Sequence, residues 1–278
     1  MELAVRFQSK SSINYMFRNF GQLFFVTLPV SVLLAIFAAP TAETDVFVKL
    51  VSGQLDTENF FNQFVNAFTV LRFTSSWWLP LLVAVVVVLL AYTMSLLVVK
   101  IDRHMRIGEM QPLPLKRAFV IFPMMLLYIF CWLAICELFV LIVVGVAYML
   151  RFLSNPYVIV GIGFGLDVLA NGILTYIFCL LIITFPLKFS ENYRFNVAMS
   201  YSARVMTSKR GKLLAFTFAF PLIRCVVMAL AYLARPLDVV IYTVGYFFLL
   251  TFIPCFAFKQ YYDDVGGERR DISQLIFG

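Results

Sequence analysis

The sequence predicts an all-α, polytopic membrane protein with six transmembrane helices and additional interfacial amphipathic helices. Of the 278 residues, 62% are hydrophobic and 13% are charged, and the mean hydropathy is +0.92. A soluble domain of this length needs much more polar surface than these residues provide. The apolar residues also form long, nearly unbroken blocks, which are typical of helices that cross a bilayer. We therefore expect residues 1–278 to form a single integral membrane domain.

The apolar blocks give the expected order of the spans. At about 1.5 Å per residue, each block is long enough to cross the roughly 30 Å apolar slab of a bilayer. We count the third block as one helix, because a split at Glu137 would leave a piece too short to cross. The third and fourth blocks are longer than the slab requires, so each must tilt, protrude or break. The predicted spans are residues 21–39, 77–99, 118–150, 157–187, 213–234 and 238–258.

Loop charges predict the orientation of these spans. The basic residues behind the net charge of +7 gather in short loops, whereas the loop over 40–76 is acidic. The positive-inside rule places basic loops on the cytoplasmic side. The basic segments 1–20, 100–117 and 188–212 then lie inside, and both termini are cytoplasmic. Because topology explains the basic residues, nucleic acid is not an expected partner.

Three segments outside the spans have the pattern of helices at a membrane surface. Residues 11–20 predict a short interfacial helix. Residues 56–71 repeat phenylalanines at helical spacing, which fits either a helix in the outer headgroup region or one packed against the ends of the spans. Residues 194–212 combine an apolar face with basic side chains, as in a helix on the inner leaflet. The basic residues of this last segment are Arg194, Arg204, Lys209, Arg210 and Lys212.

Polar residues inside the apolar blocks form the candidate binding cluster. Glu137 lies in the third span, Asp167 in the fourth and Arg224 in the fifth. Asn171 follows Asp167 by one helical turn. An unpaired charge in a bilayer is costly, so such residues usually face the bundle interior and pair. We expect Arg224 to pair with Asp167, Glu137 or both, either as a structural clamp or around a polar cavity for a headgroup or an ion.

Three glycines in the fourth span suggest a nucleotide motif that the sequence does not complete. Gly161, Gly163 and Gly165 form Gly-x-Gly-x-Gly, but a dinucleotide fingerprint needs Gly-x-Gly-x-x-Gly, and residue 166 is leucine. Gly161 and Gly165 lie one helical turn apart, and this spacing predicts close packing between membrane helices.

The cysteines and the single histidine do not indicate a metal site. The five cysteines all lie in apolar blocks and form no Cys-x-x-Cys pair, so we interpret them as packing residues. His104 lies in a basic loop without neighbouring ligands, and we expect it to be solvated. No nucleophile stands beside a base. The sequence therefore predicts no metal, no cofactor and no catalytic residue.

Short motifs outside the spans carry a resemblance to one family. These motifs are Arg106-Ile107-Gly108-Glu109, Arg117-Ala118-Phe119, and the segment from Ala198-Met199-Ser200 through Lys212. With the six-span layout, they resemble the YciC-like uncharacterised bacterial inner-membrane proteins, and the membrane domain fused to some glycerophosphodiester phosphodiesterases. The resemblance implies a multi-pass protein of the bacterial plasma (inner) membrane. It carries over no catalytic residue, because these 278 residues contain no phosphodiesterase domain.

These observations lead to three hypotheses for function. The leading one is a non-enzymatic membrane component or accessory subunit in envelope or lipid-related processes that binds lipid between its helices. The second is a small transporter or channel that uses the buried polar cluster. The third is an intramembrane enzyme that modifies lipids. The expected partners are membrane lipids, with another membrane protein or a second copy of the chain as further candidates.

Overall fold

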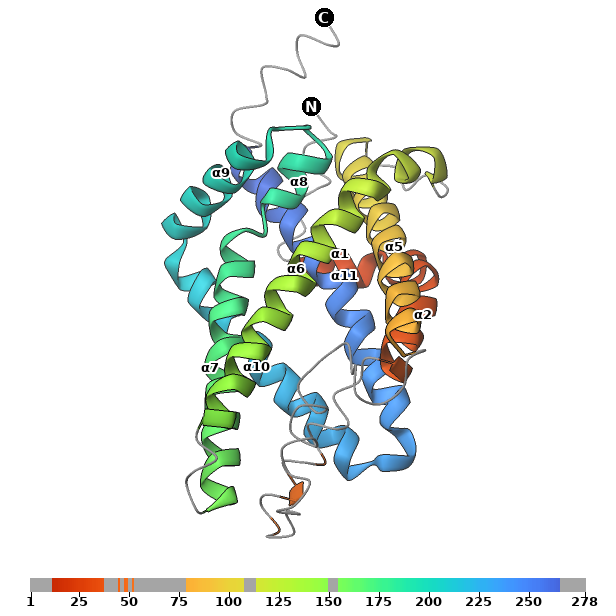
Figure 1. Ribbon diagram of the computed structural model, residues 1–278. Coiled ribbons are helices and arrows are strands. Elements are labelled where there is room, and N and C mark those ends of the chain that lie inside the picture. The colour runs from red at the N-terminus through yellow and green to blue at the C-terminus, as the bar shows by residue number, and fades with distance from the viewer. Residues whose placement is uncertain are drawn as a thin grey trace, which may run out of the picture.

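The computed structural model describes residues 12–37, 45, 48–49, 52, 79–107, 114–149 and 155–265, and their regular structure is helical throughout (Figure 1). Six of these helices are long and apolar enough to cross a membrane, which confirms the predicted fold class. The six are α2, α5, α6, α7, α10 and α11. The helices are α1 (Ser12–Arg18), α2 (Phe20–Phe37), α5 (Leu79–Ile107), α6 (Leu115–Met149), α7 (Pro156–Leu180), α8 (Thr184–Phe189), α9 (Phe195–Ser208), α10 (Arg210–Leu233), the 3-10 turn η2 (Arg235–Leu237) and α11 (Asp238–Val265).

Two spans continue well beyond their predicted ends. Helix α5 runs eight residues past 99, and α11 runs seven residues past 258. Their polar extensions were predicted as a loop and a tail, because hydropathy reports where the apolar slab ends and not where the helix ends. The third span is a single helix, α6, as predicted. The predicted outer helix over 56–71 lies outside the described residues.

Of the options open to the long fourth block, the structure shows a break. Asn155 caps the start of α7, because its side-chain oxygen accepts a hydrogen bond from the Tyr157 amide at 3.0 Å. The helix then stops at Leu180, and a turn over 181–183 leads into the short α8. Pro186 explains the break. Proline has no N–H to donate four residues back, and its ring crowds the carbonyl there.

A serine from another helix satisfies the backbone groups that this break releases. The Ser202 hydroxyl in α9 accepts a hydrogen bond from the Ile183 amide at 3.1 Å and donates one to the Leu180 carbonyl at 2.9 Å. Ser202 is fully buried. Buried backbone groups need such partners, so Ser202 ties α9 to the end of α7.

The six long helices form a ring in which each contacts the next, in the order α2, α5, α6, α7, α10 and α11, and α11 closes the ring against α2. Helix α11 also contacts α1, α5 and α8, so more elements pack on it than on any other described helix. Figure 1 shows α8, α9 and the start of α6 gathered at one end of the bundle, which we call the α9 end. The turn η2 and the start of α7 lie at the opposite end.

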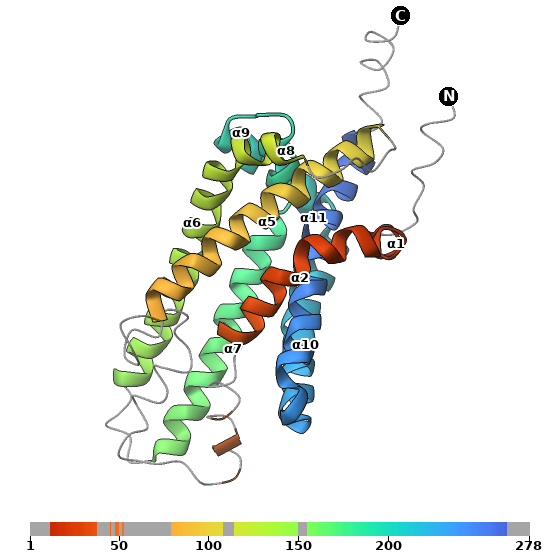
Figure 2. The same cartoon turned by 90° about the vertical axis from the view of Figure 1, so that its right-hand side faces the viewer.

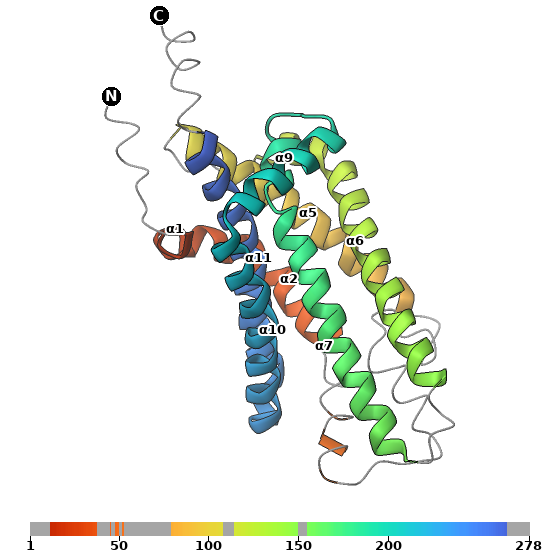
Figure 3. The same cartoon turned by 90° about the vertical axis from the view of Figure 1, so that its left-hand side faces the viewer.

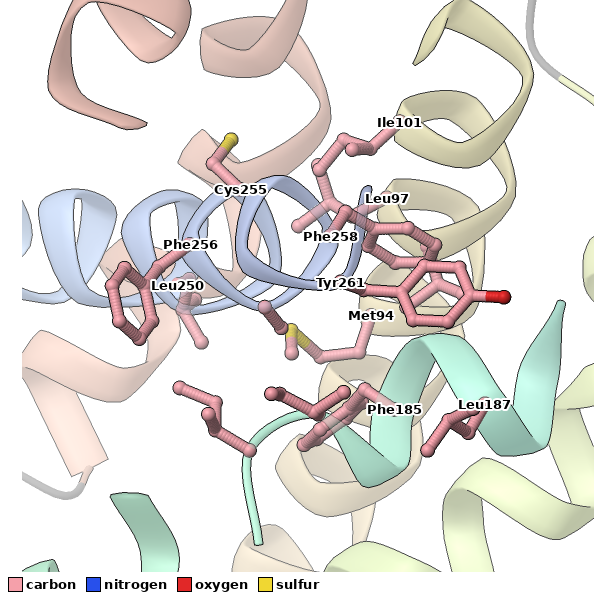
Figure 4. Packing of buried hydrophobic residues seen from close by; sticks show 14 of the residues in the cluster. Met94, Leu97, Ile101, Phe185, Leu187, Leu250, Cys255, Phe256, Phe258 and Tyr261 are labelled. Carbon is pink, nitrogen blue, oxygen red and sulfur yellow. The ribbon is translucent and has the colours of Figure 1, made fainter. Parts of the chain in front are cut away.

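The buried core is concentrated at the α9 end. Figure 4 shows residues of α5, α8 and α11 interdigitating there, among them Leu97, Phe185 and Phe258. By contrast, only 11% of the apolar window of α6 and 6% of that of α10 is buried, against 56% for α5. Side chains such as Val120 and Leu233 are about 80% exposed. Exposed apolar surface on this scale fits helices that face lipid.

Candidate functional site

The structure places the predicted intramembrane residues on three neighbouring helices. Glu137 lies in α6, Asp167 and Asn171 lie in α7, and Arg224 lies in α10. Helix α7 packs against both α6 and α10. The four residues are therefore carried by adjacent elements, as the pairing hypothesis requires.

Arg224 lies on the packed side of α10. Leu213, Arg224 and Ala231 share one side of this helix by their helical spacing, and the two apolar residues are buried. Leu222 and Val226 occupy the other side and are exposed. The guanidinium is thus directed toward neighbouring helices and not toward lipid.

The other members of the candidate binding cluster are less clearly directed into the bundle than Arg224. Asn171 in α7 is half-buried, and so is Glu137 in α6. The side chain of Asp167 lies outside the described part of the structure. The pairing of Arg224 with Asp167 or Glu137 therefore stays a prediction.

A second group of polar side chains, which the sequence analysis missed, lies at the α9 end. The Tyr15 hydroxyl of α1 bonds to Nδ1 of His104 in α5 at 2.6 Å. The Tyr262 hydroxyl of α11 donates to the Asp102 carboxylate at 2.8 Å. The group was missed because Asp102 and His104 fall beyond 99 and Tyr262 falls beyond 258, where no helix was expected. Helical periodicity that continues past residues 99 and 258 could have predicted these extensions of α5 and α11.

Tyr15 anchors α1 in the bundle. Tyr15 and its neighbour Met16 are almost fully buried, and the Thr251 hydroxyl of α11 donates to the Met16 sulfur at 3.2 Å. Burial raises the pKa of the Tyr15 hydroxyl well above its usual range, so this hydroxyl stays protonated in its hydrogen bond with His104. The expectation of a solvated His104 was wrong, because the ring is half-buried against Tyr15.

Two further polar residues at this end are buried. Asp102 and Gln260 are each 2% exposed, and the Gln260 side-chain oxygen accepts from the Lys212 ammonium at 3.3 Å. Hydrogen bonds of this kind offset the cost of burying polar groups. They link α5 and α10 to α11 at the α9 end.

Helix α9 is amphipathic, as predicted, but its buried side faces protein. Ala198, Ser202 and Met206 recur every four residues and are fully buried, and α9 packs against α7, α8 and α10. An apolar side buried in lipid was expected here, so the surface-helix prediction is corrected on this point. The basic residues remain outside. Arg194, Arg204, Arg210 and Lys212 are exposed and Lys209 is half-buried, and together these five form what we call the α9 surface.

The described residues show no close packing at the two predicted glycines. Gly161 and Gly165 are exposed, and a Cβ added to either would meet no described atom within 4 Å. The close approach between helices is found instead at Gly245 in α11, where an added Cβ would lie 3.3 Å from a methyl group of Val227 in α10.

The described residues contain no group of three or more His, Cys, Asp or Glu side chains that would hold a metal ion. All five cysteines are free thiols, and Cys179 and Cys255 are buried. Comparison of the chain with protein-family models, curated proteins and solved structures finds no match. The case for a function therefore depends on the sequence and the geometry described above.

Proposed function

We propose that the chain is a non-enzymatic component of a bacterial inner membrane that binds anionic lipid headgroups through the α9 surface. The observation that carries the proposal is the exposure of Arg194, Arg204 and Arg210 beside exposed apolar residues of the same region, such as Val197 and Leu214. Basic side chains at the edge of an apolar surface attract anionic lipids by about 1 kcal/mol each. The proposal includes membership of the YciC-like family and a cytoplasmic location for the α9 end.

The lipid-binding proposal is tested by native mass spectrometry after purification with phosphatidylglycerol and phosphatidylcholine. We expect the wild-type protein to retain phosphatidylglycerol preferentially. The triple variant Arg194→Gln, Arg204→Gln, Arg210→Gln loses this preference. The matched control neutralises Lys116 and Arg117 at the start of α6, at the same end of the bundle, and keeps it. An equal loss in both variants would show that the α9 surface has no special role.

The proposed orientation needs a separate experiment. Ser200 is exposed on α9, whereas Leu237 of η2 is exposed at the opposite end. We expect a membrane-impermeant maleimide to label Leu237→Cys in intact cells and Ser200→Cys only after permeabilisation. The reverse pattern would place the α9 end outside. Because the two sites lie at opposite ends of the bundle, each one is the control for the other.

Transport is a second candidate function, and one observation favours it. Arg224 lies on the packed side of a lipid-exposed helix, next to the helix that carries Asn171. Buried ionisable groups in membrane helices often line ion or substrate paths. Ion flux into proteoliposomes that disappears in Arg224→Leu, but not in the lipid-facing Cys225→Leu, would support transport over the proposed function.

A further inference from the structure

Three buried hydroxyl groups on or against α8 have no hydrogen-bond partner in the protein. Among the described residues, the buried side-chain oxygens in this position are those of Tyr128, Thr184 and Ser190. Thr184 begins α8, and Ser190 follows its last residue. Tyr128 belongs to α6, and its ring lies 4.7 Å from the ring of Phe185 in α8. Buried hydroxyls normally have partners, so three exceptions around one short helix indicate a common cause.

Thr184 lacks the partner that buried hydroxyls use elsewhere in these helices. Thr27 and Ser95 donate to the carbonyl four residues earlier, at 2.9 Å and 2.8 Å. For Thr184 that carbonyl belongs to Leu180, which already accepts a hydrogen bond from Ser202. Thr184 is 1% exposed, so bulk solvent does not reach its side chain. The break between α7 and α8 thus leaves a buried hydroxyl that no protein group satisfies.

The other two hydroxyls belong to the turn that joins α8 to α9. The centroid of the Tyr128 ring lies 6.4 Å from those of Phe189 and Phe195, which flank this turn. Ser190 lies at the start of the turn. Figure 2 shows α8 and α9 beside the start of α6, the helix that carries Tyr128. Tyr128 and Ser190 are therefore placed together at the end of α8 that leads into α9.

Movement of α8 out of the bundle would expose the hydroxyls to solvent, but it would cost more than it recovers. Four apolar side chains in and before α8 are at most 5% exposed and would leave the core, namely Ile182, Ile183, Phe185 and Leu187. Their burial outweighs the hydrogen bonds that three hydroxyls would regain. A bound water molecule costs only its own immobilisation, and it leaves the core in place.

The end of α8 offers water both an entry and further polar partners. Figure 3 shows the turn between α8 and α9 at the tip of the α9 end, and its residues Asn192 and Tyr193 are exposed. The carbonyls of Pro186 and Leu187 accept backbone hydrogen bonds there, at 3.0 Å and 3.1 Å, and each carbonyl has a second lone pair. They lie four and three residues before Ser190, where the side chain of a helical serine finds its acceptors.

We propose that ordered water molecules bind to α8 through the hydroxyls of Tyr128, Thr184 and Ser190. Water donates and accepts hydrogen bonds, so one molecule pairs with a hydroxyl and with a carbonyl lone pair at the same time. The site consists of neutral, buried groups. It therefore does not depend on the basic α9 surface or on the proposed function.

The sign of a stability change separates a hydroxyl bound to water from an unpaired one. Thr184→Val keeps the shape of the side chain and removes its hydroxyl. We expect its unfolding temperature to lie about 2–4 °C below that of the wild type, because the water loses a partner. Thr27→Val removes a hydroxyl with a known carbonyl partner and gives the reference for such a loss. An unchanged or higher unfolding temperature for Thr184→Val would overturn the site, since removing an unpaired buried hydroxyl does not destabilise.

A measurement on the unmodified protein covers the case in which Thr184→Val does not fold. A brief X-ray pulse converts water into hydroxyl radicals where it is bound, and mass spectrometry then locates the oxidised side chains. Phe185 touches Tyr128 and follows Thr184, and it is 3% exposed. Phe247 of α11 is 4% exposed and is the matched control. We expect Phe185 to be oxidised several times faster than Phe247, and equal rates would show that no water is bound at α8.

Discussion

The Ser202 hydroxyl of α9 lies 3.1 Å from the Ile183 amide and accepts its hydrogen bond at the break between α7 and α8. The same hydroxyl donates to the Leu180 carbonyl. A single side chain thus satisfies two backbone groups that have no helical partner at the break. The break can exist in a buried position only because another helix supplies this group.

Removing the Ser202 hydroxyl should destabilise the bundle. We expect Ser202→Ala to lower the free energy of unfolding by about 1–3 kcal/mol, because two buried backbone groups lose their partner. The measurement is reversible unfolding in mixed micelles. Ser200→Ala, at an exposed position of the same helix, should change stability by less than about 0.5 kcal/mol. Equal effects of the two substitutions would contradict the bridging role.

The bond between Tyr15 and His104 should hold α1 against α5. We expect Tyr15→Phe, which keeps the ring, to lower stability by about 1 kcal/mol and to speed amide hydrogen exchange in Ser12–Arg18. Tyr193→Phe is the control, because Tyr193 is exposed. Unchanged exchange in α1 would mean that packing of the Tyr15 ring alone fixes this helix.

The raised pKa of Tyr15 gives the stability a dependence on pH. Because the folded-state pKa exceeds the ordinary value near 10, the contribution of Tyr15 is complete below about pH 10 and is lost as pH rises above it. We expect the wild-type protein to lose stability relative to Tyr15→Phe as the pH rises from about 10 to about 12. Parallel pH profiles for the two proteins would show that Tyr15 is not protected from ionisation by burial.

The buried polar cluster is tested by combining two substitutions. Arg224→Leu should cost about 3 kcal/mol if it leaves a buried carboxylate unpaired, and adding Asp167→Leu should restore part of that loss. The lipid-facing neighbour Cys225→Leu should have little effect. A double variant no more stable than Arg224→Leu would exclude Asp167 as the partner.

The contact between Gly245 and Val227 predicts a size limit at the α10–α11 interface. An added Cβ at Gly245 would lie 3.3 Å from Val227, so Gly245→Leu should destabilise the protein by about 1–3 kcal/mol. Gly161→Ala has open space and should be neutral or stabilising, because alanine favours helix more than glycine does. The order of the two unfolding temperatures checks the prediction, and a reversed order would refute it.

Hydropathy predicted the six spans but not where their helices end. The length of an apolar block reflects the thickness of the bilayer. The polar turns that end α5 and α11 lie beyond these blocks, so hydropathy does not indicate that they are helical. A break was one of the options for the fourth block, but its position at 181–183 was not predicted. A proline inside a membrane helix is often tolerated, and at Pro186 the outcome depends on Ser202, which is distant in sequence.

The candidate sites were predictable to different degrees. Arg224 and Asn171 are recognisable in the sequence because they are polar residues within long apolar segments. The structure places their helices side by side. The partners Tyr15 and His104 are 89 residues apart, and each is unremarkable in its own segment. Their meeting depends on how α1 crosses the bundle, which no local pattern encodes.

The central place of α11 has a consequence for biosynthesis. Helices α1, α2, α5, α8 and α10 all pack on the helix that the ribosome makes last among those described. The first spans can enter the membrane one after another. The core at the α9 end, however, is incomplete until Cys255, Phe258 and Tyr261 of α11 have been synthesised. Earlier helices must wait in the bilayer with their packing surfaces uncovered. A chain that stalls before this point should therefore be recognised by membrane quality control as unassembled.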